Sequence, residues 1–332
     1  MTETSTEKKT GTNAGTNAGT STETNTGAGD GTGAGSMAEP EAEAGYGRDR
    51  LRADLRELGV RRGSVLLVQA SMKAVEPADG GAALITEVLL ELLGPAGTLV
   101  VPTYTALNSV TSRGHKLAVK DMTPEQAAEY IDALPVFDPF LSPSQEMGVL
   151  AEHVRNMSDA VRSTHPHTSF AAVGARAMEL MNVHDIDCHL GPDSPLGALY
   201  EADADNLFLG LEYNRGCTMI HLAEYHFARE RAAEDLPVYR REYKARIASA
   251  DTSDKWVTFW DLDIDDGHFG RVGAEFDAAM EGTRALRRGM VGAAHSRLVG
   301  SRAVVDFAVS WMWRNKGWAR GAHDVKCAPS SL

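Results

Sequence analysis

Residues 64–101 constrain the fold most strongly, because they read as two short apolar strands separated by one helix. Ser64–Gln69 (SVLLVQ) and Gly97–Val101 (GTLVV) are runs of β-branched residues and leucine, which is the pattern of buried strands. Between them, Gly81–Leu93 (GAALITEVLLELL) has helical periodicity and is followed by a Gly-Pro stop. A strand–helix–strand unit favours parallel pairing with a right-handed crossover, so we expect an α/β sheet.

The rest of the chain continues this mixture of short apolar strands and amphipathic helices. Further strands are expected at residues 170–173, 206–210 and 256–260. Further helices are expected at residues 51–58, 124–133, 147–156, 175–181, 218–232 and 303–313, and near Glu275. We therefore predict a three-layer α/β sandwich around a central sheet that is mixed or mostly parallel.

The first 45 residues differ sharply in composition from the remainder of the chain. Residues 2–35 are almost all Thr, Gly, Ala, Asn and Glu and contain no large apolar side chain, so this segment is predicted to be a disordered tail. It lacks the apolar core of a signal peptide, and no run of 18 apolar residues occurs elsewhere, so a cytoplasmic protein without a membrane span is expected. The predicted organisation is a tail at 1–45, one folded domain at 46–322 and a C-terminal tail at 323–332.

The charge balance argues against some classes of partner. With 46 acidic and 33 basic residues the formal net charge is −13, which disfavours nucleic acids and anionic membranes and favours cationic ligands. Three widely spaced cysteines, Cys188, Cys217 and Cys327, form no CxxC pair. A disulfide framework or structural zinc cluster is therefore not expected, and no metal is predicted.

The expected strands end in short polar segments that are suited to ligand binding. These are QASMK at 69–73, PTYT at 102–105 and LEYNRGCT at 211–218. In open α/β sheets, ligands bind beyond the carboxyl ends of the strands, where hydroxyls and small residues allow close approach. None of these segments is a Walker or GxGxxG fingerprint, so a nucleotide site is not indicated by motif, and each segment also reads as an ordinary polar turn.

His221 and Glu224 lie three residues apart on the helix expected at 218–232 and therefore share one face. Thr218 is the expected N-cap, which places His221 in the first turn, where a helix dipole favours neutral imidazole. The pair reads either as a general base with its orienting carboxylate or as a surface pair. A metal site would need a third ligand from His165, His184 or His189, but no HExxH spacing occurs.

A second concentration of polar chemistry is RSTHPHTSF at residues 162–170, where two histidines flank Pro166. The segment could supply a metal ligand, a general base or only a rigid turn. We expect the turn to aim His165 and Ser169 into a cleft and leave His167 without a role. No GxSxG elbow is present, and Ser169 and Ser194 cannot be distinguished from turn hydroxyls as nucleophiles.

Several separated segments resemble the aminoglycoside 3-N-acetyltransferase family in sequence and order. They are LLVQASMKAVEPADGGAALITEVLLELLGPAGTLVVPTYT, MGVLAEHVRNMSDAVRSTHPHTSFAAVG, LGPDSPLGALYEADADNLFLG, TMIHLAEY and MVGAAHSRLVGSRAVVDFAVSWM. The resemblance spans roughly residues 48–315. It implies that 46–322 is a catalytic domain of the antibiotic N-acetyltransferase type, distinct from the GNAT architecture, that uses acetyl-CoA as cosubstrate.

The resemblance also implies an activity and a set of site residues. The family transfers acetyl directly to the 3-amino group of a 2-deoxystreptamine ring, a reaction that gives antibiotic resistance or self-protection. By motif, His221 and Glu224 match the catalytic base and a carboxylate, and His165 matches a further active-site position. The residues matching segments near acetyl-CoA are Ser71, Lys73, Thr103, Tyr104 and Ser169.

The acceptor is expected to be a cationic small-molecule antibiotic, bound by acidic side chains. The candidates for this role are Asp187, Glu212 and Asp266, with Asp185 and the rest of the 261–266 acidic run. The chain departs from the family at Gln69, where a histidine is usual, and in the loop before His221, which bears on the acceptor pocket. Alternatives are therefore another amino-antibiotic or biosynthetic amine as acceptor, a metal-dependent hydrolase using His165, His184 and His221, or an antibiotic-sequestering protein. A homodimer is one of the oligomeric states left open.

Overall fold

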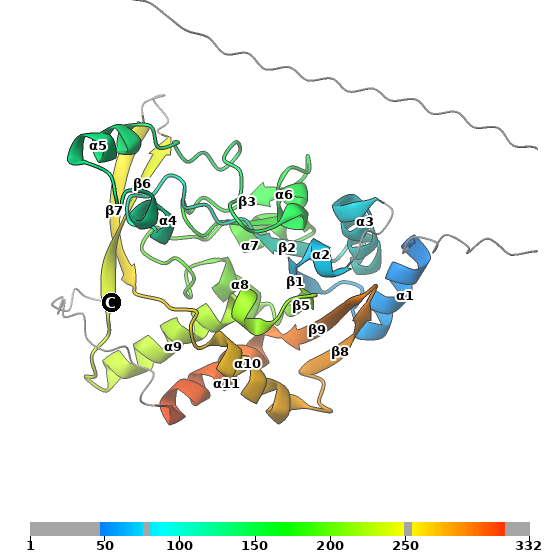
Figure 1. Cartoon of the computed structure of the whole chain (residues 1–332). Helices are drawn as coiled ribbons and strands as arrows, with labels where there is room; N and C mark the ends of the chain where they lie inside the picture. The colour runs from blue at the N-terminus through cyan, green and yellow to red at the C-terminus, as the bar shows by residue number, and fades with distance from the viewer. Residues whose placement is uncertain (1–46, 76–79, 249–253, 316–332) are drawn as a thin grey trace, which may run out of the picture. The chain divides into compact units, whose positions relative to one another are not determined.

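A computed structural model describes residues 47–75, 80–248 and 254–315 (Figure 1). The tails predicted at 1–45 and 323–332 lie outside these residues. Within them, the strands form one seven-stranded sheet and a separate two-stranded ribbon. No helix in the described ranges is long and apolar enough to cross a membrane.

The centre of the large sheet is the parallel unit expected from residues 64–101. β1 (Val65–Ala70) pairs in parallel with β2 (Thr98–Pro102) on one side and with β5 (Asp205–Leu209) on the other. α3 (Gly81–Leu93) makes the crossover from β1 to β2 and has the predicted bounds. The predicted parallel pairing is therefore confirmed.

Antiparallel strands complete the sheet on both sides, in the order β3-β4-β2-β1-β5-β9-β8. Their bounds are β3, Val161–Arg162; β4, Phe170–Gly174; β8, Leu286–Val291; and β9, Ala294–Gly300. β4 runs antiparallel to β2, and β9 runs antiparallel to β5. The sheet is mixed, as predicted, with parallel strands at its centre.

Helices cover both faces of the sheet, which gives the predicted three layers (Figure 1). Alternate residues of β1 point to opposite faces, so Leu66 and Val68 enter one core while Val65 and Leu67 enter the other. The first core is closed by α1 (Arg48–Leu58), α3 and α6 (Val149–Arg155). The second is closed by α7 (Ala177–Met181), α8 (Pro195–Glu201), α9 (Met219–Ala233), α10 (Phe269–Met280) and α11 (Ser301–Arg314).

A ribbon of two antiparallel strands stands apart from the large sheet. It consists of β6 (Arg240–Ala248) and β7 (Asp254–Leu262), and Figure 1 shows α4 (Arg113–Ala118) and α5 (Pro124–Asp132) beside it. Isolated bridges join Ser109 to Ala245 and Phe137 to Ile247. The long connection between β2 and β4 is therefore held against the ribbon. The short α2 (Met72–Val75) and the 3-10 turn η1 (Tyr213–Arg215) complete the described elements.

Candidate active site

The His221–Glu224 pair forms on the first turns of α9, as the three-residue spacing predicts. His221 Nδ1 lies 2.6 Å from Glu224 Oε2. The main chain of His221 donates to the Thr218 carbonyl at 3.0 Å, so His221 is in the first turn. Thr218 is the N-cap residue, as predicted, but its side chain makes no capping hydrogen bond. The backbone of Thr218 is helical, whereas side-chain capping normally accompanies a non-helical backbone at the N-cap.

The surroundings of Glu224 fix the orientation of the imidazole. Glu224 is 5% exposed, and its Oε1 accepts a hydrogen bond from the Asp265 main chain at 3.1 Å. Burial raises the pKa of Glu224, and the hydrogen bonds from His221 and the Asp265 main chain oppose that rise. When Glu224 is ionised it can only accept, so in that state Nδ1 of His221 carries the shared proton and Nε2 is left as an acceptor. The Phe269 ring packs edge-on at 4.7 Å and restricts the imidazole further.

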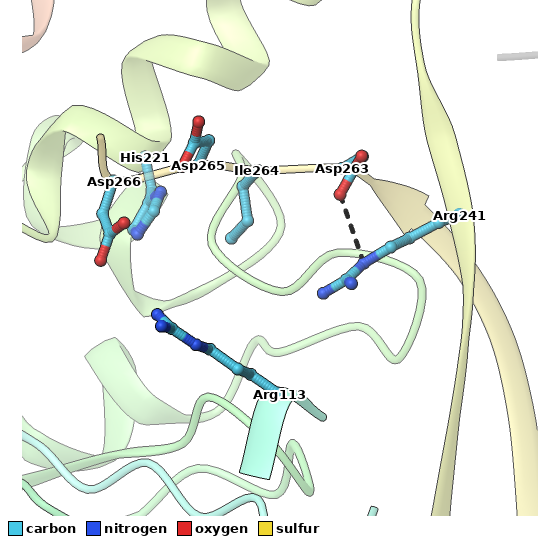
Figure 2. A pocket seen from close by; sticks show the side chains of 7 residues that line it. All are labelled: Arg113, His221, Arg241, Asp263, Ile264, Asp265 and Asp266. Atoms are coloured by element: carbon cyan, nitrogen blue, oxygen red, sulfur yellow. Dashed lines mark ion pairs between the residues drawn. The ribbon is translucent and has the colours of Figure 1, made fainter. Parts of the chain in front are cut away.

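His221 lines a cavity of about 340 Å³ (Figure 2). The lining residues come from α4, α9, β6 and the segment after β7: Arg113, His221, Arg241, Asp263, Ile264, Asp265 and Asp266. Figure 2 shows His221 beside Asp265 and Asp266, with Arg113 reaching toward them from the opposite wall. The cavity therefore combines a partly exposed imidazole with carboxylates and two guanidinium groups.

The three acidic residues predicted to bind substrate are in different places. Asp266 lines the cavity. Glu212 is paired with Arg297 at 2.8 Å and is not among the lining residues. Asp187 is exposed and also lies outside the lining. The structure thus brings only Asp266 of the three together with His221.

His165 is buried and does not line this cavity. Its Nδ1 accepts from the main chains of His167 at 3.1 Å and Thr168 at 3.2 Å, and its Nε2 lies 3.2 Å from the Ile186 carbonyl. Burial, followed by the neighbouring His189, lowers the pKa of His165 well below its ordinary value. With both ring nitrogens engaged inside the fold, this imidazole holds the RSTHPHTSF turn in place.

His167, for which no role is expected, lies among other histidines. His167 is also buried, and its Nδ1 lies 3.4 Å from His189 Nε2. The ring of His165 stacks at 4.7 Å on that of His184 and lies 4.5 Å from that of His189. The Pro166 turn brings both of its flanking imidazoles into one cluster, which we call the buried histidine cluster: His165, His167, His184 and His189.

Asp261, at the start of the acidic run expected on the substrate face, bonds to this cluster instead. It is fully buried, and its Oδ2 accepts from His189 Nδ1 at 2.7 Å and from the Tyr225 hydroxyl. Asp261 differs from Asp263, Asp265 and Asp266 because it still belongs to β7, whose side chains alternate between two faces. Asp261 faces the core, whereas the chain beyond the strand lines the cavity. No group of three or more potential ligands with metal-binding geometry occurs within the described ranges.

The residues predicted to contact acetyl-CoA lie at strand ends, outside the lining of the cavity in Figure 2. Ser71 follows β1, and Lys73 is exposed on α2. Thr103 and Ser169 lie in adjacent chain segments, with their hydroxyl oxygens 3.2 Å apart. Ser169 Oγ also accepts from Arg162 Nε at 3.0 Å, so both hydroxyls belong to a buried polar network.

Some of the buried polar atoms that have no hydrogen-bond partner among the described residues lie near the ends of β1 and β2 and the start of α9. They are Gln69 Oε1, the Tyr104 hydroxyl and the Thr218 hydroxyl. Burial raises the pKa of Tyr104 and the Thr218 hydroxyl opposes that rise, so these two side chains are neighbours. A Cβ at Gly216 would lie 2.9 Å from Gln69 Nε2, which places Gln69 against the loop that leads into Thr218 and α9. Such unsatisfied donors and acceptors suit a ligand with carbonyl and amide groups, as in the arm of acetyl-CoA.

Arg113 and Arg241 are the site residues that sequence reasoning missed. Both lie in segments whose charges read as ordinary solvated surface, and no motif links them to His221. Only the pairing of the β2–β4 connection with the ribbon brings them to the same cavity. Asp263 and Asp265 fall within the acidic run that was expected to face substrate.

A comparison with known proteins decides the family. The model of the aminoglycoside 3-N-acetyltransferase family matches residues 67–313. The chain belongs to the aminoglycoside 3-N-acetyltransferase family. Aminoglycoside N(3)-acetyltransferase VII of Streptomyces paromomycinus is 34% identical over 289 residues, covering 82% of this chain and 94% of the relative. The predicted resemblance is confirmed, and it places the chain among acyltransferases.

Solved structures of similar proteins support the same fold. AAC-IIIb in a binary complex with CoASH aligns with a TM-score of 0.69 at 27% identity, covering 84% of this chain and 100% of that one. AAC-VIa bound to sisomicin aligns with a TM-score of 0.67 at 26% identity, covering 82% and 99%. The predicted antibiotic N-acetyltransferase type of α/β fold is therefore confirmed for this aminoglycoside 3-N-acetyltransferase family member.

Proposed function

We propose that this protein transfers the acetyl group of acetyl-CoA directly to an amino group of an aminoglycoside or similar amino-antibiotic. The 3-amino group of a 2-deoxystreptamine ring is the proposed acceptor. His221 is the general base, and Glu224 holds it in the required tautomer. His165 acts through the buried turn that it stabilises, as a positioning residue.

One observation carries the proposal: the Glu224–His221 pair opens onto a cavity with three aspartates. A protonated amine is not a nucleophile, so an acceptor bound there must lose one proton before attack and a second N–H proton as the new bond forms. Nε2 of His221 is the available acceptor for that proton, since Nδ1 is committed to Glu224. Nearby carboxylates attract an ammonium-rich ligand and stabilise the imidazolium that forms.

The proposed transfer balances without any further reagent. The bound ammonium first releases one proton to solvent. The neutral amine nitrogen then attacks the thioester carbonyl carbon while a second N–H proton passes to His221 Nε2. The carbon–sulfur bond then breaks, and the imidazolium returns the proton to the departing sulfur. The products are an amide and the CoA thiol, and His221 is again neutral.

The two cysteines in the described ranges support direct transfer over an acyl-enzyme route. Burial raises the pKa values of the Cys188 and Cys217 thiols to about 12 in each case. Both remain protonated near neutral pH, and a thiol is a much poorer nucleophile than a thiolate. Holding amine and thioester in one site supplies the rate advantage that a covalent intermediate would otherwise provide.

The ligands named in the solved relatives agree with this proposal. AAC-IIIb is described with CoASH and AAC-VIa with sisomicin, an aminoglycoside. In this chain, the orphaned polar atoms of Gln69, Tyr104 and Thr218 suit the thioester arm, whereas Asp265 and Asp266 suit the acceptor.

The direct test is incubation of the full chain with acetyl-CoA and a panel of aminoglycosides that includes sisomicin. We expect thiol release together with a product 42 Da heavier, the mass of one acetyl group in place of hydrogen, with the acetylated nitrogen assigned by NMR. His221→Ala should lower kcat/KM by about 10²–10⁴-fold and leave CoA affinity within about twofold. Drug binding without thiol release would instead indicate sequestration, and an almost fully active His221→Ala would remove His221 as the base.

A further inference from the structure

Arg113 is a cation in the His221 cavity without a counter-ion from the part of the chain that the structure describes. Arg241, which also lines the cavity, lies 3.4 Å from Asp263. Among the described residues, no carboxylate lies within ion-pair distance of Arg113. The charge of one lining arginine is therefore partly neutralised, whereas the charge of the other is open to a ligand.

The backbone that carries Arg113 is tied down on both sides. Residues just before it bond to β6: Arg246 N donates to the Asn108 carbonyl at 2.9 Å, and Lys244 N donates to Thr111 Oγ1 at 3.1 Å. Ser112 caps α4 by accepting from the His115 main chain at 3.1 Å. Because these bonds fix the first residue of α4, the long side chain starts from a defined point at the cavity wall.

The two walls of the cavity carry opposite charge. Figure 2 shows Arg113 on one side and Asp265, Asp266 and His221 on the other. A purely polycationic ligand matches the acidic wall and is repelled by the guanidinium of Arg113. A ligand that carries an amine and an anionic oxygen group matches both walls, and guanidinium binds phosphate or carboxylate oxygens through two parallel hydrogen bonds.

We propose that Arg113 forms an anion subsite in this cavity and binds a phosphate group of a ligand that reaches it. The proposal rests on the proposed function for the role of the cavity and deepens it, because it adds a negatively charged group to the ligands that the cavity accepts. The phosphate belongs either to CoA or to a phosphorylated amine acceptor. The chemistry at Arg113 is the same in the two cases.

Calorimetric titration of the full chain distinguishes the two sources. One arm compares CoA with pantetheine, which lacks the phosphates. The other compares glucosamine 6-phosphate with glucosamine on protein saturated with CoA. Both arms use the wild type, Arg113→Gln and a control, Lys116→Gln, which removes an exposed charge from the same helix but does not line the cavity.

In one of the two arms, we expect Arg113→Gln to bind the phosphorylated ligand about 10–100-fold more weakly than the wild type does. The unphosphorylated counterpart should bind to Arg113→Gln and to the wild type with equal affinity. Lys116→Gln should retain wild-type affinities. The arm that responds identifies the source of the phosphate. A preference for phosphate that persists in Arg113→Gln, or no preference in either arm, would overturn the subsite. Since binding is measured without turnover, failure of the acetyl-transfer proposal would be visible separately.

Discussion

At the scale of single residues, the two candidate bases, His221 and His165, differ in how many of their ring nitrogens are already hydrogen-bonded within the protein. His221 has one nitrogen committed to Glu224 and one available in a cavity. His165 has both nitrogens bonded to the surrounding chain, and burial lowers its pKa. An imidazole of the second kind stabilises a turn, whereas one of the first kind is suited to accept a proton from a ligand.

Glu224→Gln tests the orienting role of the carboxylate. The amide of the variant can donate to Nδ1, which would move the imidazole proton to Nε2 and disable the base. We expect kcat/KM to fall by about 10²–10⁴-fold with little change in CoA affinity, measured by thiol release and calorimetry. Glu234→Gln, at the exposed end of the same helix, should behave as wild type. A Glu224→Gln enzyme with nearly normal turnover would show that the carboxylate does not set the tautomer.

The pair itself could be predicted from sequence because residues three apart on a helix share a face. The opposite wall could not, since Arg113 and Arg241 are 128 positions apart and meet only through the pairing of the β2–β4 connection with β6. The acidic run at 261–266 is one segment in sequence, but its members lie in different surroundings. Asp261 pairs with His189 in the interior, whereas Asp266 lines the cavity.

At the scale of elements, helices were predicted more closely than strands. α3 and α5 agree with the expected ranges because their apolar periodicity and stop or capping residues are local signals. Three strands are not expected from the sequence: β6 (RREYKARIA), β8 (LRRGMV) and β9 (AHSRLVG). Each contains charged residues, which are typical of surface loops. Strand direction was also not readable for β4, whose antiparallel pairing depends on the long connection before it.

Close packing of α10 on η1 gives a test of this element arrangement. A Cβ added at Gly273 would lie 2.1 Å from the Tyr213 ring, so Gly273→Ala must displace the ring or the helix. We expect the variant to lower the free energy of unfolding by about 1–3 kcal/mol, measured by denaturant titration. Gly270→Ala on the same helix meets only Asn214 Cβ at 3.5 Å and should be neutral or slightly stabilising. Equal stability of the two variants would contradict the packing.

At the scale of the whole described molecule, the buried histidine cluster joins the large sheet to the ribbon. His189 lies 4.1 Å from the Tyr243 ring of β6, and His165 lies 5.4 Å from the Phe259 ring of β7. Burial is the main cause that lowers the pKa of His167 to about 3 and that of His184 to about 4. These side chains are therefore held neutral in the folded protein at pH 7.

This cluster predicts loss of stability in mild acid. Unfolded histidines bind protons near pH 6.5, but the folded His167 and His184 do so only near pH 3–4, so the unfolded state takes up more protons as pH falls. Their contribution is complete above pH 6.5 and declines below it, by about 1–2 kcal/mol per histidine at pH 5. Denaturant titrations from pH 7.5 to pH 4.5 measure the slope.

The matched variant for this measurement is His167→Phe, which keeps a ring of similar shape and removes one titrating group. Its free energy of unfolding should depend less steeply on pH than that of the wild type over the same range. His153→Phe, on α6 outside the cluster, should keep the wild-type slope. If both variants retained the wild-type dependence, the buried cluster would not be the source of the acid sensitivity.

The position of the cavity walls has a consequence for how this protein can change over generations. Arg113, Arg241 and the Asp263–Asp266 segment belong to the β2–β4 connection, the ribbon and the chain after it, whereas the two apolar cores surround the large sheet. Under the proposed function, substitutions at these positions would alter the charge offered to the acceptor without opening a void in either core. Selection by a new antibiotic can therefore act on recognition while the stability of the scaffold is preserved.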